Sequence, residues 1–235
     1  MIDTHSHLLY GIDDGCKSLD ESISIIKKYN EIGINKIILT PHYIKDSSYD
    51  STKINNQKIM SILKKELKKQ NIKTTLYLGN EIYIDEDIEL LIKQNKISSL
   101  NNSKYLLIEL PMSGEKENYM DIFLDLISNG YKVVLAHPER YISFQKDFTK
   151  IYDLQDIGVL FQCNIGSILG DYGKKAKKTL IRLLKCDSVF MFGTDIHHKK
   201  KDYNFLEKAT KKLKKYVTEE QLEDLLENNA KKILN

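Results

Sequence analysis

The chain has 235 residues, with 36 Lys and Arg against 33 Asp and Glu and a formal net charge of +3. This length suits one α/β barrel or two small domains, and it can bury a sizeable core without disulfides. The small net charge argues against nucleic acid or a membrane surface as the main partner. We therefore expect neither nucleic-acid binding nor membrane insertion.

Three cysteines, Cys16, Cys163 and Cys186, occur without CxxC spacing. An odd number of unclustered cysteines is typical of free thiols in a reducing compartment. Residues 1–5 have neither a charged n-region nor an apolar h-region, so a signal peptide is not expected. Apolar runs are also too short for a membrane span. These features together predict a cytoplasmic protein.

Short β-branched runs alternate with amphipathic segments along the chain, which predicts alternating strands and helices. In chain order we expect strand 1–4, helix 19–32, strand 36–40, helix 53–70, strand 74–79, helix 85–94, strand 105–109, helix 118–129, strand 132–137, helix 149–156, strand 159–164, helix 174–185, strand 189–193, and helices 203–215 and 219–226. Ser18 with Glu21 and Thr218 with Gln221 fit capping boxes at two helix starts.

The order of these elements predicts the class of fold. Repeated strand-then-helix units favour parallel strands joined by helical crossovers. Seven strands without a GxGxxG motif after the first one favour a barrel over a dinucleotide-binding sheet. We see no linker, repeat or low-complexity block. The prediction is an α/β barrel that forms a single domain over residues 1–235.

All six histidines fall in four short motifs, each at or just after the end of a predicted strand. The motifs are THSH at 4–7, TPH at 40–42, AHPER at 136–140 and TDIHH at 194–198. In an α/β barrel, the carboxyl ends of the strands form the rim on which active sites are built. Imidazole is the commonest metal ligand in proteins. Histidines at four strand ends, with acidic residues nearby, predict one polynuclear metal site.

Two of the motifs place a pair of ligands two residues apart. Alternation along an extended strand directs His5 and His7 to the same side of the chain. The same geometry lets Asp195 and His197 converge at the last strand. His198 follows immediately and faces elsewhere, so we leave it outside the predicted ligand set.

Three further carboxylates complete the predicted set. Asp14 lies in the loop GIDDG at 11–15, whose sequence alone is typical of an ordinary turn. The presence of His5 and His7 beside this loop favours a metal ligand instead. Glu109 ends an apolar run, where a carboxylate is costly to bury unless it is paired or bound to metal. Glu81 follows the strand 74–79, and the alternative there is an exposed acid at the start of a loop.

The nine predicted ligands offer nitrogen and oxygen donors and no thiolate: His5, His7, Asp14, His42, Glu81, Glu109, His137, Asp195 and His197. Such a set is too large for one ion and suits two or three divalent metals, such as Mn²⁺, Fe²⁺ or Zn²⁺. Bound water would lose a proton at such a cluster, so hydroxide on the metal is the predicted nucleophile. Arg140 can hold phosphate oxygens with a bidentate contact. Together these residues predict phosphoester hydrolysis.

This set of motifs resembles the polymerase-and-histidinol-phosphatase (PHP) superfamily. Within it, DTHSH at 3–7, GIDDG at 11–15 and AHPERY at 136–141 are similar to the bacterial protein-tyrosine phosphatases of capsule and exopolysaccharide operons. The resemblance runs from residue 1 to about residue 198. It implies a distorted, TIM-like (β/α)7 barrel with a trinuclear centre that often depends on Mn²⁺.

The resemblance also implies which ligands share an ion. The first ion would take His5, His7, Glu81 and Asp195. The second would take Glu81, Glu109 and His137, with Glu81 bridging. The third would take Asp14, His42 and His197. Arg140 corresponds to the phosphate-binding arginine of the family.

The chain departs from the family pattern at two places. Relatives from Gram-positive bacteria typically carry a second arginine after the last histidine ligand, whereas residues 198–202 read HKKKD here. Basic residues can also follow the Thr-x-His motif, where this chain has Tyr43. Lys200 or Lys201 can supply charge but not the fork of a guanidinium. Tyr43, Lys200 and Lys201 are therefore candidate substrate contacts.

The leading hypothesis is metal-dependent hydrolysis of phosphotyrosine on a protein, with an autophosphorylating tyrosine kinase of capsule or exopolysaccharide synthesis as partner. Tyrosinate leaves fairly easily because tyrosine has a pKa of about 10, so a strong general acid is not required. Leu169, Ser22 and Phe192 occupy the arginine position of a Cys-x5-Arg motif, which excludes a cysteine nucleophile. Two alternatives stay open: hydrolysis of a small phosphomonoester such as histidinol phosphate, and an inactive, metal-binding regulatory domain.

Overall fold

The computed structural model describes residues 1–49, 51–113, 118–200 and 202–235. The strands are β1 (Ile2–Asp3), β2 (Lys36–Leu39), β3 (His42–Tyr43), β4 (Thr75–Leu78), β5 (Glu81–Tyr83), β6 (Tyr105–Glu109), β7 (Lys132–Ala136), β8 (Leu160–Asn164) and β9 (Val189–Gly193). The α-helices are α1 (Leu19–Glu31), α2 (Lys53–Lys69), α3 (Ile88–Lys93), α4 (Tyr119–Ser128), α5 (Ile142–Lys146), α6 (Thr149–Asp156), α7 (Gly173–Lys185), α8 (Phe205–Leu213), α9 (Glu219–Glu223) and α10 (Asn229–Leu234). Shorter turns are η1 (Leu100–Asn102), η2 (Pro138–Arg140), η3 (Ile165–Ile168) and the π-helical η4 (Asp224–Asn228).

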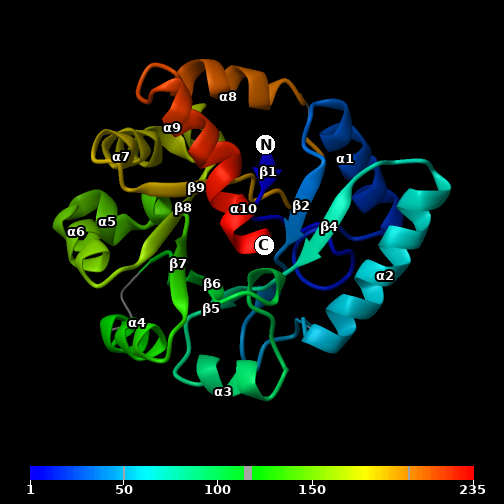
Figure 1. Cartoon of the computed structure of the whole chain (residues 1–235), viewed down its shortest axis with the longest axis horizontal. Coiled ribbons are helices and arrows are strands. Elements are labelled where there is room, and N and C mark those ends of the chain that lie inside the picture. The colour runs from blue at the N-terminus through cyan, green and yellow to red at the C-terminus, as the bar shows by residue number, and fades with distance from the viewer. Residues whose placement is uncertain (50, 114–117, 201) are drawn as a thin grey trace.

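The strands pair in parallel in two sheets, with the orders β1-β2-β4 and β3-β5-β6-β7-β8-β9. The two sheets are continuous along one side of the barrel. There β3 follows β2 and β5 follows β4 after two residues each, and β3 pairs with β5 as β2 pairs with β4. On the other side, a parallel bridge between Ser6 and Ile196 joins the segments that follow β1 and β9. The strands thus surround one core and the helices lie outside them (Figure 1), as in the distorted α/β barrel that the sequence predicts.

All seven predicted strands are present in the structure, with ends that differ by at most one residue. The strands β3 and β5 are not among the predicted elements, and Glu81, which was expected to follow the strand 74–79, begins β5. The helix α5 is also absent from the predicted elements, and the last predicted helix continues past residue 226 through η4 into α10. The predicted strand 132–137 is one residue too long, because His137 adopts a left-handed backbone with φ of 35°.

Of the two predicted capping boxes, one forms completely. The Thr218 hydroxyl accepts from the Gln221 backbone while the Gln221 side chain accepts from the Thr218 backbone. At α1 the Ser18 hydroxyl accepts from the Glu21 backbone, but the Glu21 carboxylate reaches back to the amide of Lys17 instead. The capping box predicted at Ser18 is therefore only half formed.

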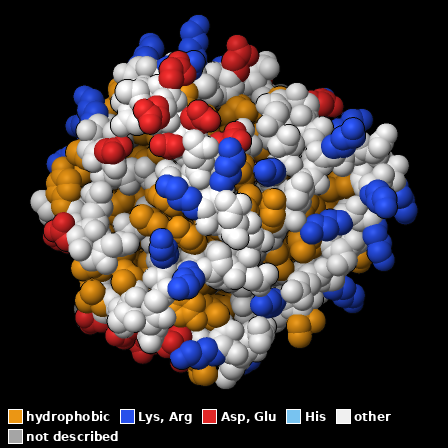
Figure 2. All heavy atoms as spheres, in the orientation of Figure 1, with side chains coloured by type: hydrophobic (Ala, Val, Ile, Leu, Met, Phe, Trp, Pro, Cys, Tyr) orange, Lys and Arg blue, Asp and Glu red, His pale blue; other side chains and the backbone are white. Residues whose placement is uncertain are grey.

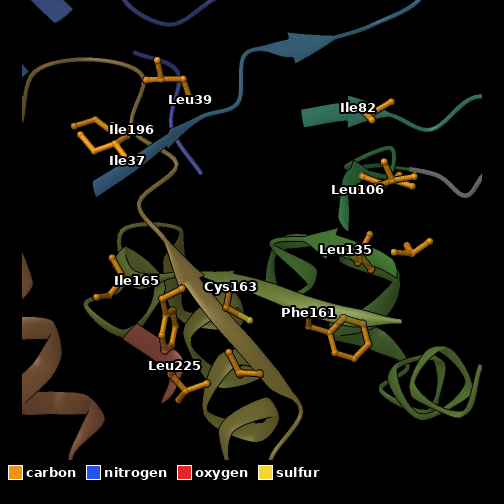
Figure 3. Close-up of a cluster of buried hydrophobic side chains, with 14 of the residues drawn as sticks. Ile37, Leu39, Ile82, Leu106, Leu135, Phe161, Cys163, Ile165, Ile196 and Leu225 are labelled. Atoms are coloured by element: carbon orange, nitrogen blue, oxygen red, sulfur yellow. The ribbon is translucent and has the colours of Figure 1, made fainter. Parts of the chain in front are cut away.

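Alternate residues of each strand face different surroundings, as the pleat of a strand requires. Leu106, Leu135 and Phe161, from three neighbouring strands, belong to the large cluster between the barrel wall and the helices (Figure 3). Leu107 and Val134 face the interior, where they form a second, smaller apolar cluster. The interior is therefore a packed core and not a channel.

One end of the barrel is closed by the end of the chain. Ile233 of α10 packs into the interior cluster, and α10 lies across that end of the strands (Figure 1). Figure 2 shows this face, where lysines line the edge formed by α2 and acidic side chains gather over α9. Among the described residues, no helix combines the length and the apolar character needed to cross a bilayer. The opposite end of the strands carries the histidines.

Candidate metal centre

The carboxyl ends of the strands bring the nine predicted ligands into one connected cluster, in which each has a ligand atom within 4 Å of another member. Ligand atoms of eight of the nine residues form three groups whose members all lie within 4.8 Å of one another, and His137 joins the cluster through Glu81 and Glu109. The inward-facing side chains of β6 and β8 change from apolar to polar at this end, since Glu109, Gln162 and Asn164 follow the core layer. The centre therefore rests on the packed interior of the barrel.

The most deeply buried group contains His5, His7, Glu81 and Asp195. The Nε2 atoms of His5 and His7 lie 3.1 and 3.2 Å from Glu81 Oε2, and both are 3.5 Å from Asp195 Oδ1. Both imidazoles and Glu81 have no exposed side-chain surface. These four residues are the same four that the family resemblance implies as ligands of the first ion.

Glu81 lies at the middle of the centre and contacts four imidazoles. Besides its contacts with the first two histidines, its Oε2 is 3.0 Å from His42 Nδ1 and its Oε1 is 2.9 Å from His137 Nε2. Glu109 reaches the same two rings at 3.6 and 3.7 Å. The second geometric group is His42, Glu81 and Glu109, whereas the family resemblance implies His137 as the histidine that shares an ion with these carboxylates. A bridging position for Glu81 fits both groupings.

The third group is the most open to solvent. His197 Nε2 and His42 Nε2 lie 3.5 and 3.8 Å from Asp14 Oδ1, and His7 belongs to the same group. The Asp14 side chain is 52% exposed. Burial, followed by the neighbouring His7, lowers the pKa of His197 to about 4, so this ring stays neutral near pH 7. Neutral imidazole is the form that binds metal.

The electrostatics of the centre are those of a site with excess negative charge. Burial lowers the pKa of His5, but the carboxylates of Glu81 and Asp195 outweigh it and raise that pKa to about 9. Burial and the neighbouring Glu81 charge raise the pKa of Glu109 to about 9. The carboxylates thus attract protons when no other cation neutralises them.

Two buried polar atoms that can coordinate a metal indicate what kind of cation fits the centre. Glu81 Oε2 and His42 Nδ1 are both buried and face each other at 3.0 Å, yet neither forms a hydrogen bond. Buried polar atoms of folded proteins almost always have a partner. A divalent metal is the partner that nitrogen and carboxylate donors share, and the residues of the centre therefore fit such ions.

Side chains behind the ligands hold the two buried imidazoles in position. Asp13 Oδ2 lies 2.8 Å from His7 Nδ1 and also accepts from the amide of His42 at 2.9 Å. Gln162 Oε1 lies 2.7 Å from His5 Nδ1. We had not assigned a function to Asp13 or Gln162. For Asp13, the available signal in the sequence is its position next to Asp14. For Gln162, the signal is its place in β8, where alternation along the strand directs its side chain inward.

Arg140 lies at the rim of the centre, in the η2 turn that follows His137. Its Nη1 donates to Asp195 Oδ2 at 2.6 Å, and its guanidinium lies 4.6 Å from the centre of the Tyr172 ring. Asn164 Nδ2 donates to the same Asp195 oxygen at 2.7 Å. Asp195 therefore has one oxygen toward the histidines and the other toward Arg140.

The structure places the remaining candidates as follows. Tyr43 lies in β3 next to His42 and is partly buried. The Lys200 ammonium lies 4.3 Å from the Phe205 ring centre and 3.6 Å from Asp171, and Lys201 lies outside the described residues. His198 is 59% exposed, with Nδ1 3.8 Å from Glu21, which agrees with leaving it out of the ligand set.

The fold and the centre together define an α/β-barrel protein with a histidine–carboxylate cluster on its carboxyl-terminal rim. All 235 residues match the family described as capsular polysaccharide synthesis, CpsB/CapC. The chain belongs to this family, which confirms the resemblance seen in its motifs.

Characterised relatives cover most of the chain. Tyrosine-protein phosphatase YwqE of Bacillus subtilis is 32% identical over 85% of this chain and 78% of its own length. Tyrosine-protein phosphatase CpsB of Streptococcus agalactiae is 30% identical over 100% of this chain and 98% of its own.

Solved structures agree with the fold. A crystal structure from a study of B. subtilis YwqE and Streptococcus pneumoniae CpsB, described as unique metal-dependent tyrosine phosphatases, superposes with a TM-score of 0.88. It is 30% identical and the match covers 94% of this chain and 90% of that one. Histidinol phosphate phosphatase from Lactococcus lactis matches with a TM-score of 0.60 at 17% identity, over 92% of this chain and 93% of that one, and supports the fold alone.

Proposed function

We propose that this protein is a metal-dependent phosphatase that hydrolyses phosphotyrosine on proteins. The observation that carries this proposal is Arg140 at the rim of a nine-ligand histidine–carboxylate cluster, in a chain whose relatives are named tyrosine-protein phosphatases. Phosphate is the group that guanidinium and divalent metals recognise together. The enzyme is then a phosphoric monoester hydrolase without a cysteine nucleophile.

The proposed cofactor is two or three divalent ions, with Mn²⁺ as the first expectation and Fe²⁺ or Zn²⁺ as alternatives. The nine ligands hold them, with Glu81 shared between neighbouring ions because it contacts imidazoles on several sides. When bound, such ions lower the pKa of water and neutralise charge on the transferred phosphoryl group. Asp13 and Gln162 fix the rings of His7 and His5, so that their Nε2 atoms point into the centre.

Arg140 binds the phosphoryl group in this proposal. Asp195 and the Tyr172 ring hold its guanidinium in one orientation, and N–H groups other than Nη1 remain for non-bridging phosphate oxygens. The ring of Tyr49 stacks on His42 at 6.2 Å between centroids, so aromatic side chains stand at two places on the rim. Such rings can pack against the phenyl ring of an aryl phosphate.

The proposed physiological substrate is an autophosphorylating tyrosine kinase that controls capsule or exopolysaccharide synthesis, met in the cytoplasm. The family to which the chain belongs is described by capsular polysaccharide synthesis, which supports this assignment.

The experiment that tests this function compares kcat/KM of the Mn²⁺-loaded protein for a phosphotyrosyl peptide and for histidinol phosphate. We expect a strong preference for the peptide. Arg140→Ala should lower that rate by about 10²–10³-fold, because it removes a phosphate contact, while His198→Ala should leave it unchanged. Faster hydrolysis of histidinol phosphate would contradict the proposal. Equal rates for the parent, Arg140→Ala and His137→Ala would instead favour an inactive regulatory domain.

A further inference from the structure

We propose that the groove between α5 and α7 binds an acidic stretch of the substrate protein next to its phosphotyrosine. This inference rests on the proposed phosphatase function and adds a preference among phosphotyrosyl sequences. The α5–α7 groove is a cavity of about 270 Å³, and its lining includes Gln145, Lys146, Phe148, Lys175, Lys178 and Arg182.

The charge of the groove has one sign. Lys146 comes from α5, and Lys175, Lys178 and Arg182 come from α7. Spacings of three and four residues place the three α7 cations on one face of that helix, while Ala176, Leu180 and Leu183 are buried. Of the residues that the structure describes, no Asp or Glu lines the groove. A ligand with several carboxylates matches this surface.

Apolar side chains give the groove a firm floor. The Phe148 ring is 5% exposed, and the Arg182 guanidinium lies 3.9 Å from its centre. Stacking of this kind restricts the orientation of Arg182 and leaves its N–H edge for a carboxylate. Ile142, at 48% exposure, adds apolar surface at the border of the same cavity. An acidic peptide, with aliphatic parts as well as charges, therefore fits better than a free inorganic anion.

Both walls of the groove are attached to the turn that carries Arg140. On the α5 side, Gln145 Nε2 donates to the carbonyls of Glu139 at 2.9 Å and Arg140 at 3.3 Å. On the α7 side, Tyr172 immediately precedes the helix and its ring lies against the Arg140 guanidinium. The groove is therefore anchored to the turn that carries Arg140, and the proposal places the residues next to the phosphotyrosine in this groove.

The dimensions suit a short peptide segment. Lys175 and Arg182 are seven residues apart on α7, which corresponds to roughly 10 Å along the helix axis. An extended peptide advances about 3.3 Å per residue. The row of cations therefore spans about three successive substrate residues, and a cluster of Asp or Glu is the matching sequence.

The test uses pairs of phosphotyrosyl peptides that differ only in whether three flanking residues are Glu or Gln. The run is placed on either side of the phosphotyrosine in separate pairs. The Mn²⁺-loaded parent is compared with a Lys175→Glu/Lys178→Glu double variant. A Lys64→Glu/Lys68→Glu variant makes the same charge change on exposed positions of α2 and serves as the matched control. The readout is the ratio of kcat/KM for the Glu peptide to that for the Gln peptide.

For the parent we expect a ratio of about ten in at least one peptide pair, expressed mainly in KM and reduced by added salt. The α7 double variant should bring the ratio to one or below, and the α2 control should keep it. The Gln peptide reports whether each variant is folded and active.

Equal hydrolysis of Glu and Gln peptides by the parent would overturn the groove proposal and leave the phosphatase proposal standing. An α2 control that loses as much of the ratio as the α7 variant would also overturn it, since general charge would then be the cause. If the parent hydrolysed none of the phosphotyrosyl peptides, both proposals would fall together.

Discussion

The two sides of the candidate metal centre use the same kinds of side chain in different surroundings. On the buried side, His5 and His7 have no exposed surface, and Gln162 and Asp13 hold their Nδ1 atoms. On the open side, Asp14 is 52% exposed, and His197 Nδ1 lies 3.0 Å from a carbonyl of its own loop.

This difference predicts unequal metal affinities. Ligands held in place by packing and by hydrogen bonds lose little freedom when a metal binds. An exposed carboxylate must be ordered from solvent, and the ordering costs free energy. We therefore expect a tightly held ion beside His5 and His7 and a more readily exchanged ion beside Asp14.

The largest effect is expected where the two sides meet, at Glu81. Glu81→Ala removes the carboxylate that contacts four imidazoles, so both sides should lose metal. We predict a fall in kcat of at least about 10³-fold, with metal content measured on the same sample. Glu220→Ala, on the exposed start of α9, is the control that should behave like the parent. Retention of full metal content by Glu81→Ala would show that this residue does not join the two sides.

A smaller loss is expected when the support of the buried side is weakened. Asp13→Asn keeps the shape of the side chain but no longer stabilises the His7 ring through a carboxylate. Metal affinity or kcat should fall by about 10–100-fold, as is usual for residues behind metal ligands. Asp20→Asn at the exposed start of α1 provides the comparison. An Asp13→Asn protein with the affinity of the parent would remove the proposed cause of the asymmetry.

The open side should tolerate change better. Asp14→Ala removes its exposed carboxylate and leaves the buried side intact. We expect the loss of about one metal equivalent and a decrease in kcat/KM of roughly tenfold, below that of either previous variant. Isothermal titration with Mn²⁺ measures both sites in one experiment. If Asp14→Ala instead lost the tightest site, the assignment of affinities would be reversed.

The smallest effect concerns the stability of the metal-free protein between pH 7 and 9. Folded protein keeps protons on His5 and Glu109 up to a pKa of about 9, whereas ordinary values are about 6.5 and 4.3. Folded protein then binds more protons than unfolded protein, so stability falls as pH rises through this range. The slope is roughly 1 kcal/mol per pH unit for each retained proton. Thermal unfolding at several pH values, with and without Mn²⁺, measures it, and a stability that rises toward pH 9 would contradict these shifts.

The nine residues predicted as ligands could be placed together from the sequence because a parallel barrel converts sequence position into spatial position. Residues at the carboxyl end of any strand meet at the same rim, whatever their separation along the chain. His5 and Asp195 are far apart in the sequence, yet for this reason His5 Nε2 lies 3.5 Å from Asp195 Oδ1 in the structure. The strands β3 and β5 were not predicted because they contain only two and three residues, and a segment this short shows no recognisable alternation of apolar and polar side chains.

The residues behind the ligands were not predictable in the same way. Gln162 is a common polar residue without a metal-ligand motif, and its role depends on the tight approach of β8, β9 and the segment after β1. Gly193 makes that approach possible, since a Cβ there would lie 2.5 Å from His5 Cβ and 2.9 Å from Gln162 Nε2. The pairing of His42 or His137 with Glu109 likewise depends on side-chain placement that strand order alone does not determine.

The most direct test of the account is a metal count made alongside activity. Protein freed of metal by chelation is titrated with Mn²⁺, and bound metal per chain is measured together with hydrolysis of a phosphotyrosyl peptide. We predict two or three bound ions per chain, a tight one first, with full activity reached only as the weaker positions fill. A single bound ion that gives full activity, or full activity in the absence of any divalent metal, would contradict the polynuclear centre.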